Sequence, residues 1–328
     1  MTLRIGILGA ARIAPAACIK PARHTDGVEV VAIAARDQAK ARAFATKHGI
    51  DRVHASYADL LADPEIDAVY NPLPNGLHGA WTLRSIDAGK HVLCEKPFTA
   101  NAAEATMVTE QIEAQDRVVM EAFHYRYHPM MRSALEVIAR GELGQITRVD
   151  TTMCIPLPLR NDIRYQLDLA GGSLMDIGCY AVHLWRTLAG AEPSVVSAEA
   201  KTLSAGIDRW TSARFAAGEV EGTMTCALLS SSLLRLSAKV TGTEGTMSLF
   251  NPLGPQAYNR TRIRTRSGSR VEHAVRIPTY TFQMAAFRDA VIDGAPFPTT
   301  PRDAIATMSI IDAVYEATGL GPRQPSAT

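Results

Sequence analysis

The sequence predicts an α/β protein in two parts: a doubly wound parallel sheet, followed by an α+β domain with a large open, mostly antiparallel sheet. The chain has 328 residues, and a chain of this length normally forms two domains rather than a single hydrophobic core. Up to about residue 122, short β-rich runs alternate with helical ones; beyond it, extended runs follow one another through short glycine-containing turns. We therefore expect one domain at 1–122 and a second at 123–328.

The first domain is expected to be a series of β–α units. Its strands are predicted at 3–8 (LRIGIL), 28–35 (VEVVAIAA), 67–71 (DAVYN), 91–95 (HVLCE) and 117–122 (RVVMEA). Its helices are predicted at 12–23, 37–48, 76–88 and 100–115. Strands that alternate with helices of this length form a parallel sheet with right-handed crossovers.

The second domain is expected to be a sheet with one face covered by helices. A helix at 129–140 leads to a strand near 145–153. Further strands are predicted at 194–203, 209–216, 220–230, 233–242 and 246–250, and two apolar helices at 282–294 and 306–318. Runs rich in Thr, Val and Leu that are joined by short turns favour antiparallel or mixed pairing.

Composition argues against partnership with nucleic acid or membrane. The net charge is +1, and no apolar run approaches membrane-spanning length. The five cysteines include no C-x-x-C pair, which indicates reduced thiols without a disulfide framework or a metal site. Because the N-terminus enters a strand at once, without the pattern of an export signal, we expect a cytoplasmic protein.

One basic segment, NRTRIRTRSGSR, suggests nucleic-acid binding at first sight. It places Arg260, Arg262, Arg264 and Arg266 at strand period, so that they would project from one face of a hairpin turning at Ser267 and Gly268. In a nearly neutral chain without an aromatic platform, we interpret this face as a solvated strand surface instead.

The first strand runs into GILGAARIA, where Gly6, Gly9, Ala11 and Ala14 follow a strand and open a helix. Backbone amides at such a helix start suit a pyrophosphate, and small residues allow its close approach. Ala11 stands where the usual G-x-G-x-x-G fingerprint has its second glycine. The position after the first strand of a βα series nevertheless predicts a dinucleotide site.

The end of the second strand indicates which nucleotide is preferred. Ala34 and Ala35 stand where an acid would bind the adenosine ribose, and Arg36 follows. A cation there would pair with a 2′-phosphate, so NADP is favoured, with NAD as the alternative. Asp37 is interpreted as a helix N-cap, although a shifted register would make it the ribose acceptor.

Two further loops lie at carboxyl ends of strands, where ligands bind in open α/β sheets. One is YNPLPNGLHGAW and the other is HVLCEKPF, which holds Glu95 and Lys96 before a proline. A lysine in this place could be ordinary surface charge. It gains a function only if it faces polar residues of the second domain.

The stretch GGSLMDIGCYAVH sets Asp176, Tyr180 and His183 four and three residues apart. On a helix these three side chains share one face and can reach a common ligand. Gly171 and Gly172 would let another backbone come close, and Gly178 would stand where a larger residue does not fit. The alternative is that the three polar groups only satisfy each other for structural reasons.

These segments, with EAFHYRYHP and VTGTEGTM, resemble in order the glucose-fructose oxidoreductase, inositol dehydrogenase and rhizopine-catabolism family of NAD(P)-dependent dehydrogenases. The motifs are most similar to the trans-dihydrodiol dehydrogenase and NADP-dependent D-xylose dehydrogenase branch. Inositol-dehydrogenase-like members generally carry histidine where this chain has Tyr180. The resemblance implies a Rossmann domain and a domain with a large open sheet, through whose outer face a homodimer or homotetramer assembles.

The resemblance also implies roles for individual residues. The catalytic lysine falls on Lys96, the acid/base on Tyr180, and supporting positions on Asp176 and His183, with His183 as the alternative base. The implied cofactor-binding residues are Gly9, Ala10, Ala11, Arg12, Ile13, Arg36, Leu73, Pro74, Asn75, His78, Glu95, Lys96 and Arg164. The implied substrate-binding residues are Lys96, Arg126, Asp176, Tyr180, His183 and Tyr280. For Arg126 and Arg164 the alternative is an interdomain ion pair, and for Tyr280 a core aromatic.

The chemistry explains why a phenol and an ammonium would be needed. Removing hydride from a secondary or anomeric hydroxyl requires a base for the O–H proton. A phenol with a pKa near ~10 must lose ~2 to 3 units to work near neutrality, which corresponds to ~3 to 4 kcal/mol. One ammonium about 4 Å away supplies ~4 kcal/mol at an effective dielectric of about 20.

We therefore expect an oxidoreductase that transfers hydride between NADP and a small-molecule sugar or related cyclic diol. Two alternatives share the fold. One is a non-catalytic nucleotide sensor, against which the intact set of polar residues argues. The other is an enzyme that never releases its nucleotide and shuttles hydride between two sugars.

Overall fold

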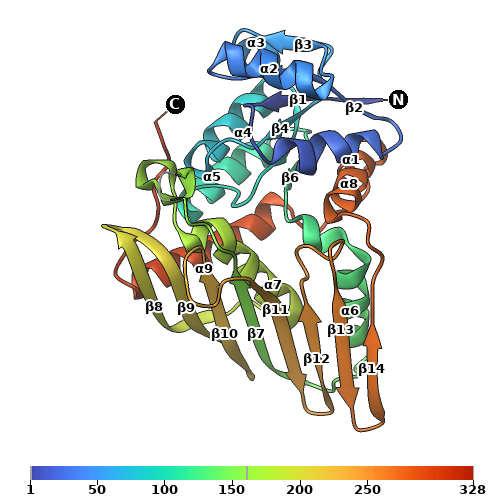
Figure 1. Ribbon diagram of the computed structural model, residues 1–328, viewed down its shortest axis with the longest axis vertical. Coiled ribbons are helices and arrows are strands. Elements are labelled where there is room, and N and C mark those ends of the chain that lie inside the picture. Colours follow the sequence, from blue (N-terminus) through green and yellow to red (C-terminus); the bar gives the residue numbers. More distant parts are fainter. Residues whose placement is uncertain (1, 160–161, 328) are drawn as a thin grey trace. The chain divides into compact units, whose positions relative to one another are not determined.

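The computed structural model describes residues 2–159 and 162–327, which form two compact units (Figure 1). The first unit comprises residues up to 124, together with 280–305 and 325–327. The second comprises 125–279 and 306–324 within the described ranges. The boundary after residue 122 stays a prediction, and no sequence pattern assigned residues 280–305 to the first unit.

A six-stranded parallel sheet with strand order β3-β2-β1-β4-β5-β6 forms the centre of the first unit. Its strands are β1 (Leu3–Leu8), β2 (Val28–Ala34), β3 (Arg52–His54), β4 (Ala68–Asn71), β5 (His91–Cys94) and β6 (Val119–Glu121). The predicted doubly wound fold is thereby confirmed. Because the order reverses between β1 and β4, a crevice for ligands is expected at the carboxyl ends of these two strands.

Helices connect these strands in the order expected for crossovers. They are η1 (Pro15–Ile19), α1 (Lys20–Arg23), α2 (Gln38–His48), α3 (Tyr57–Ala62), η2 (Asn75–Leu77), α4 (His78–Asp87) and α5 (Ala102–Glu113). Asp37, Ser56 and Asn101 cap α2, α3 and α5, since each side chain accepts a hydrogen bond from the backbone three residues later. The N-cap interpretation of Asp37 is therefore confirmed.

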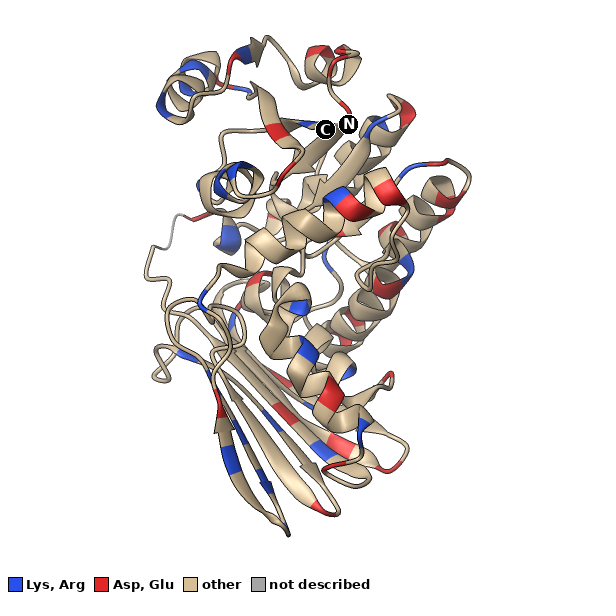
Figure 2. Cartoon of the chain, turned by 90° about the vertical axis from the view of Figure 1, so that its right-hand side faces the viewer, with Lys and Arg blue, Asp and Glu red and all other residues tan. Residues whose placement is uncertain are grey.

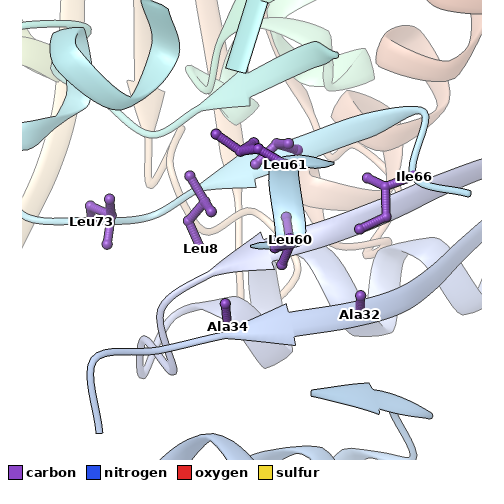
Figure 3. Close-up of a cluster of buried hydrophobic side chains, with 8 residues drawn as sticks. Leu8, Ala32, Ala34, Leu60, Leu61, Ile66 and Leu73 are labelled. Carbon is purple, nitrogen blue, oxygen red and sulfur yellow. The ribbon is translucent and has the colours of Figure 1, made fainter. Parts of the chain in front are cut away.

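The core of the first unit places α3 against the sheet (Figure 3). Leu60 is fully buried in a cluster that includes Leu8 and Val69. Gly6 leaves room for this packing, because a Cβ on it would lie 2.8 Å from Leu60 Cδ2 and that side chain would have to shift. Neither β3 nor α3 was predicted, although both flank the nucleotide end of the sheet.

An eight-stranded sheet forms the second unit, in the order β14-β13-β12-β11-β7-β10-β9-β8. Its strands are β7 (Ile146–Cys154), β8 (Ser194–Ser204), β9 (Ile207–Ala217), β10 (Val220–Ala227), β11 (Arg235–Gly242), β12 (Gly245–Phe250), β13 (Arg260–Thr265) and β14 (Gly268–Glu272). Only β7 and β10 pair in parallel; all other neighbours are antiparallel. The predicted mostly antiparallel sheet is confirmed.

Further helices complete the second unit. They are η3 (His124–Tyr127), α6 (Pro129–Ala139), η4 (Ile163–Tyr165), η5 (Leu167–Leu169), η6 (Leu174–Gly178) and α7 (Cys179–Ala189). The last two helices are α8 (Thr279–Asp293), which belongs to the first unit from Tyr280, and α9 (Pro301–Ala317), which belongs to the second from Ala306. Across the described residues, none of the helices is both long and apolar enough to cross a membrane.

Helix α7 lies directly on one face of this sheet. Trp185 Nε1 donates to the Val149 carbonyl at 2.8 Å, and Thr151 Oγ1 donates to the Ala181 carbonyl at 3.0 Å. A Cβ on Gly178 would lie 2.7 Å from Cys226 Sγ of β10, which confirms that a larger residue does not fit there. The helix that carries the predicted site residues is thus held close to β7 and β10.

Basic and acidic residues are interspersed along the eight-stranded sheet (Figure 2). On β13, Thr261 and Ile263 are buried while the intervening Arg262 and Arg264 face outward, as the strand period predicted. Arg266 lies beyond the strand and forms an ion pair with Glu244 at 3.1 Å. The arginines therefore share their surface with acids rather than forming a continuous basic patch.

We expect Leu60→Ala to lower the free energy of unfolding of the first unit by about 2–5 kcal/mol, because it leaves a cavity between α3 and the sheet. Urea denaturation would measure the loss. Leu233→Ala is the matched control, since that leucine is 66% exposed. Equal midpoints for the two variants would contradict the packing described.

Candidate active site

The turn after β1 has the features of a nucleotide-binding turn. Gly9 has φ of +91°, a left-handed conformation that favours glycine. Within the described chain, the backbone N–H groups of Ala10, Ala11 and Ile13 make no hydrogen bond, while Ala14 N–H bonds to the Ala11 carbonyl. The turn thus leaves donors available for a pyrophosphate, and its residues fit the implied cofactor despite Ala11 replacing a glycine.

Sequence reasoning missed an aromatic pair beside this turn. The rings of Tyr57 and Trp81 meet edge to face with centroids 4.8 Å apart, and Arg84 lies 4.5 Å from the centroid of the Trp81 ring. Burial raises the pKa of the Tyr57 phenol, and the charge of Arg36 opposes that rise. Arg36 itself is exposed directly after β2, where the 2′-phosphate of NADP would bind.

His78 joins the two loops that follow β4 and β5. Its Nδ1 lies 2.7 Å from the Pro97 carbonyl and its Nε2 lies 2.7 Å from the Leu73 carbonyl. Burial lowers the pKa of this imidazole to about 4, which outweighs the two carbonyl contacts that favour the charged form. The predicted cofactor residues Leu73 and His78 are therefore in direct contact, and His78 orients both loops.

The end of the chain also reaches the loop after β4. Ser326 N–H donates to the Gly76 carbonyl at 2.8 Å, and a Cβ on Gly76 would overlap the Ser326 side chain. The glycine between Asn75 and Leu77 is thus needed for a close approach by the C-terminal residues. No pattern in the sequence signals this contact, because the two segments lie about 250 residues apart.

The CEKP turn is held by buried carboxylates on both sides. Tyr70 OH donates to Glu95 Oε1 at 2.7 Å. After the lysine, Phe98 N–H donates to Glu121 Oε1 at 2.9 Å and Ala100 N–H donates to Glu104 Oε2 at 2.8 Å. Lys96 lies between these anchors and is half-buried, so the turn that carries it has one well-defined path.

In the second unit, Asp176 lies on the π-helical turn η6 and Tyr180 and His183 lie on α7. Their exposed fractions are 7%, 5% and 2%. The segment is helical as predicted, but its first turn is wider than the 3.6-residue period assumed. Turns of this type are rare and are found frequently at functional sites.

A second tyrosine engages His183. Tyr125 OH lies 2.5 Å from His183 Nδ1, and the ring centroids of Tyr125 and Tyr180 are 6.1 Å apart. The sequence motif EAFHYRYHP contains Tyr125, but nothing in its spacing pointed to that residue. Because one imidazole nitrogen is already committed to a phenol, His183 is suited to orienting neighbouring groups.

Asp176 is held by an arginine. Arg164 Nε donates to Asp176 Oδ1 at 2.9 Å, and Arg164 Nη1 lies 3.0 Å from Asp162 Oδ1. The charge of Asp176 is the main reason that the pKa of Arg164 is raised, with Asp162 adding to it. The bond from Arg164 Nε therefore orients the Asp176 carboxylate.

The remaining predicted residues are placed as follows. Tyr280 packs on His124 with ring centroids 4.1 Å apart, within the first unit. Arg126 lies in η3 of the second unit and is partly exposed. The structure thus brings together Asp176, Arg164, Tyr180 and His183 in one unit and the nucleotide turn with Lys96 in the other.

Comparison with known proteins decides the family. Residues 3–123 match the family described as an oxidoreductase family with an NAD-binding Rossmann fold, and residues 131–248 match the GFO/IDH/MocA C-terminal domain. The chain belongs to the GFO/IDH/MocA family. It is an NAD(P)-dependent oxidoreductase, as the resemblance implied.

Two curated relatives of this GFO/IDH/MocA protein represent the branch expected from its motifs. It is 36% identical over 324 residues to D-xylose 1-dehydrogenase (NADP(+)) 2 of Haloferax volcanii, covering 97% of this chain and 98% of that relative. It is 34% identical over 229 residues to human trans-1,2-dihydrobenzene-1,2-diol dehydrogenase, covering 68% and 67%.

A solved structure of the family has a similar fold throughout. The 3-ketoreductase KijD10 from Actinomadura kijaniata, in complex with NADP and TDP-benzene, is 26% identical to this chain. Its TM-score is 0.87, and the comparison covers 100% of both chains.

We predict that His78 makes the stability of this oxidoreductase depend on pH. Between about pH 6.5 and pH 4 the unfolded chain binds a proton that the folded chain excludes, so stability is lost as the pH falls through this window. The decrease in the free energy of unfolding attributable to His78 is about 3 kcal/mol. Urea unfolding at several pH values should show that the advantage of the wild type over His78→Asn shrinks by that amount, whereas a constant advantage would contradict it.

Proposed function

We propose that the chain is an NADP-dependent dehydrogenase or reductase acting on a hydroxyl or carbonyl group of a sugar or a related cyclic diol. The observation that carries this proposal is the buried group of Asp176, Tyr180 and His183, each held by a polar partner or an aromatic neighbour, in a chain of an NAD-binding oxidoreductase family. Such a group supplies a proton donor and acceptors for hydroxyls on one helix.

NADP as the preferred nucleotide is supported by the end of β2. Ala34 and Ala35 have no group that could bind both ribose hydroxyls, and Arg36 is exposed directly after them. The aromatic pair of Tyr57 and Trp81 lies near this end of the sheet and could support the adenosine. An NADP-dependent relative and an NADP complex of a related ketoreductase agree with this preference.

We assign the proton transfer to Tyr180. When bound, the nicotinamide accepts or gives the hydride. Tyr180 would take the proton of the substrate hydroxyl, or return it to the carbonyl oxygen, and the ammonium of Lys96 would favour its ionised form. His183, whose Nδ1 contacts Tyr125, would orient the substrate, and Asp176 would accept hydrogen bonds from its hydroxyls.

The substrate class is supported by the names of the relatives: a D-xylose 1-dehydrogenase, a trans-1,2-dihydrobenzene-1,2-diol dehydrogenase and a dTDP-3,4-didehydro-2,6-dideoxy-alpha-D-glucose 3-reductase. An oriented carboxylate such as that of Asp176 suits a polyhydroxylated ligand, because it can accept from two hydroxyls at once.

We also propose a cytoplasmic homo-oligomer, either a dimer or a tetramer, that assembles through the outer face of the eight-stranded sheet. Large apolar side chains are exposed on its strands: Val196, Phe250 and Val271 are 55%, 45% and 46% exposed. Light scattering of the purified protein should give a mass above that of one chain. Phe250→Glu should reduce that mass, and a monomeric wild type would contradict the proposal.

Arg36→Ala should raise the Kd of NADP about 10- to 100-fold, because a charge-assisted pair with the 2′-phosphate is worth about 1.5–3 kcal/mol. The Kd of NAD should change less than about twofold, since NAD carries an uncharged hydroxyl in place of the 2′-phosphate. Fluorescence titration with both nucleotides measures the difference. Arg42→Ala, on the neighbouring helix α2, is the control. A parallel loss for NAD and NADP would remove Arg36 from this role.

Tyr180→Phe should lower kcat about 10²- to 10⁴-fold with little change in the Kd of NADP, because it removes only the proton-transferring hydroxyl. Lys96→Ala should lower kcat as well, whereas His183→Asn should mainly raise KM for the sugar. Turnover on a panel of pentoses, hexoses and cyclic diols provides the readout. Tyr258→Phe, at an exposed tyrosine, should leave turnover unchanged.

The same experiment separates the alternatives. Tight NADP binding by a wild type that turns over nothing in the panel would indicate a nucleotide sensor. NADP that copurifies and is reduced by one sugar and reoxidised by another would indicate a sugar–sugar oxidoreductase. A larger loss for His183→Asn than for Tyr180→Phe would transfer the acid/base role to the histidine.

A further inference from the structure

A fully buried carboxylate lies beneath the loop that precedes the Asp176 turn. Asp208, at the start of β9, is 0% exposed and accepts hydrogen bonds from five donors. They are Ser173 Oγ (2.6 Å), Leu174 N–H (2.7 Å), Thr211 Oγ1 (3.0 Å), Tyr315 OH (2.9 Å) and Arg323 Nη2 (2.8 Å). A charge buried in this way persists only when it is paired and hydrogen-bonded.

Two of the partners of Asp208, Tyr315 on α9 and Arg323 in the segment after it, also contact each other. The guanidinium of Arg323 lies 4.0 Å from the centroid of the Tyr315 ring, and Arg323 Nε donates to the Gly171 carbonyl at 2.8 Å. Gly172, with φ of +132°, lies against the carboxylate, and a Cβ there would come within 2.7 Å of Tyr315 OH. Asp208 and its two partners Tyr315 and Arg323 thus contact four consecutive residues, 171–174.

The loop held in this way begins the π-helical turn. Leu174, whose amide donates to Asp208, is the first residue of η6, and Asp176 follows two residues later. A π-helical turn is rare and usually less favourable than an α-helical one, so its surroundings must hold it in place. Relaxation to an α-helical turn would rotate Asp176 relative to Tyr180, because the two turns contain different numbers of residues.

We propose that Asp208, supported by Arg323 and Tyr315, is a positioning residue that sets the direction of Asp176 and Tyr180 toward the substrate. The proposal rests on the function proposed above for those two residues. Asp208 acts only through residues 171–174, by way of the Ser173 hydroxyl and the backbone, and takes no part in proton transfer. A purely structural role would give the same hydrogen bonds. The test must therefore distinguish an effect on the orientation of Asp176 and Tyr180 from an effect on the stability of the fold.

The test compares Asp208→Asn with Met247→Ala, a cavity variant in β12 of the same sheet that is chosen to lower Tm. Both are assayed at a temperature at which each is fully folded. Asp208→Asn should lower kcat at least about tenfold and shift the pH profile of kcat, because the acid/base no longer faces the substrate correctly. The Kd of NADP should stay within about twofold of the wild-type value, since the nucleotide turn lies in the other unit.

Met247→Ala should keep kcat within about twofold of the wild type despite its lower Tm. Hydrogen exchange supplies a second readout: the amides of residues 173–178 should exchange faster in Asp208→Asn and not in Met247→Ala. If Asp208→Asn does not fold, Tyr315→Phe and Arg323→Lys replace it, each removing or weakening one donor. Arg323→Lys should recover more kcat than Arg323→Met, because it keeps the charge.

Equal kcat and unchanged exchange in Asp208→Asn would overturn the proposal, as would a loss of kcat in Met247→Ala of the same size. If the wild type turns over no sugar or diol, the proposed function fails. Hydrogen exchange then decides separately whether Asp208 holds the π-helical turn, and unchanged exchange would again overturn the proposal.

Discussion

Buried carboxylates that accept backbone N–H groups hold the segments on which the rest of the site depends. Glu121 and Glu104 accept from Phe98 and Ala100 after the CEKP turn, and Asp208 accepts from Leu174 before the Asp176 turn. A buried carboxylate oxygen is costly to leave without a donor, so the backbone N–H groups that it binds fix the path of each loop. The backbone of these loops is therefore fixed in position although it is not part of regular helices or strands.

Hydrogen bonds and ion pairs within the second unit orient the polar side chains of the candidate site. Asp176 forms an ion pair with Arg164, which also pairs with Asp162. His183 Nδ1 is in contact with the phenol of Tyr125. Each of the two residues thus has a polar partner that orients its side chain.

Local patterns predicted much of this molecule, and long-range contacts explain the rest. The strands, the Asp37 cap and the close packing at Gly178 follow from periodicity and side-chain volume. β3, with three residues at the sheet edge, is too short for its period to be recognised. Asp208 and Arg323 lie 115 residues apart, and π-helical turns have no sequence period of their own, so neither could be found without coordinates.

The first unit is discontinuous in sequence, and this has a consequence for how the chain folds during synthesis. Residues 280–305 and Ser326 complete the unit that residue 2 begins. On a ribosome adding roughly 5–20 residues per second, the parallel sheet is made within the first minute but must wait for these late segments to emerge. The second unit is interrupted in the same way, because residues 306–324 follow residues 280–305, so neither unit is complete until the C-terminal end of the chain has been made.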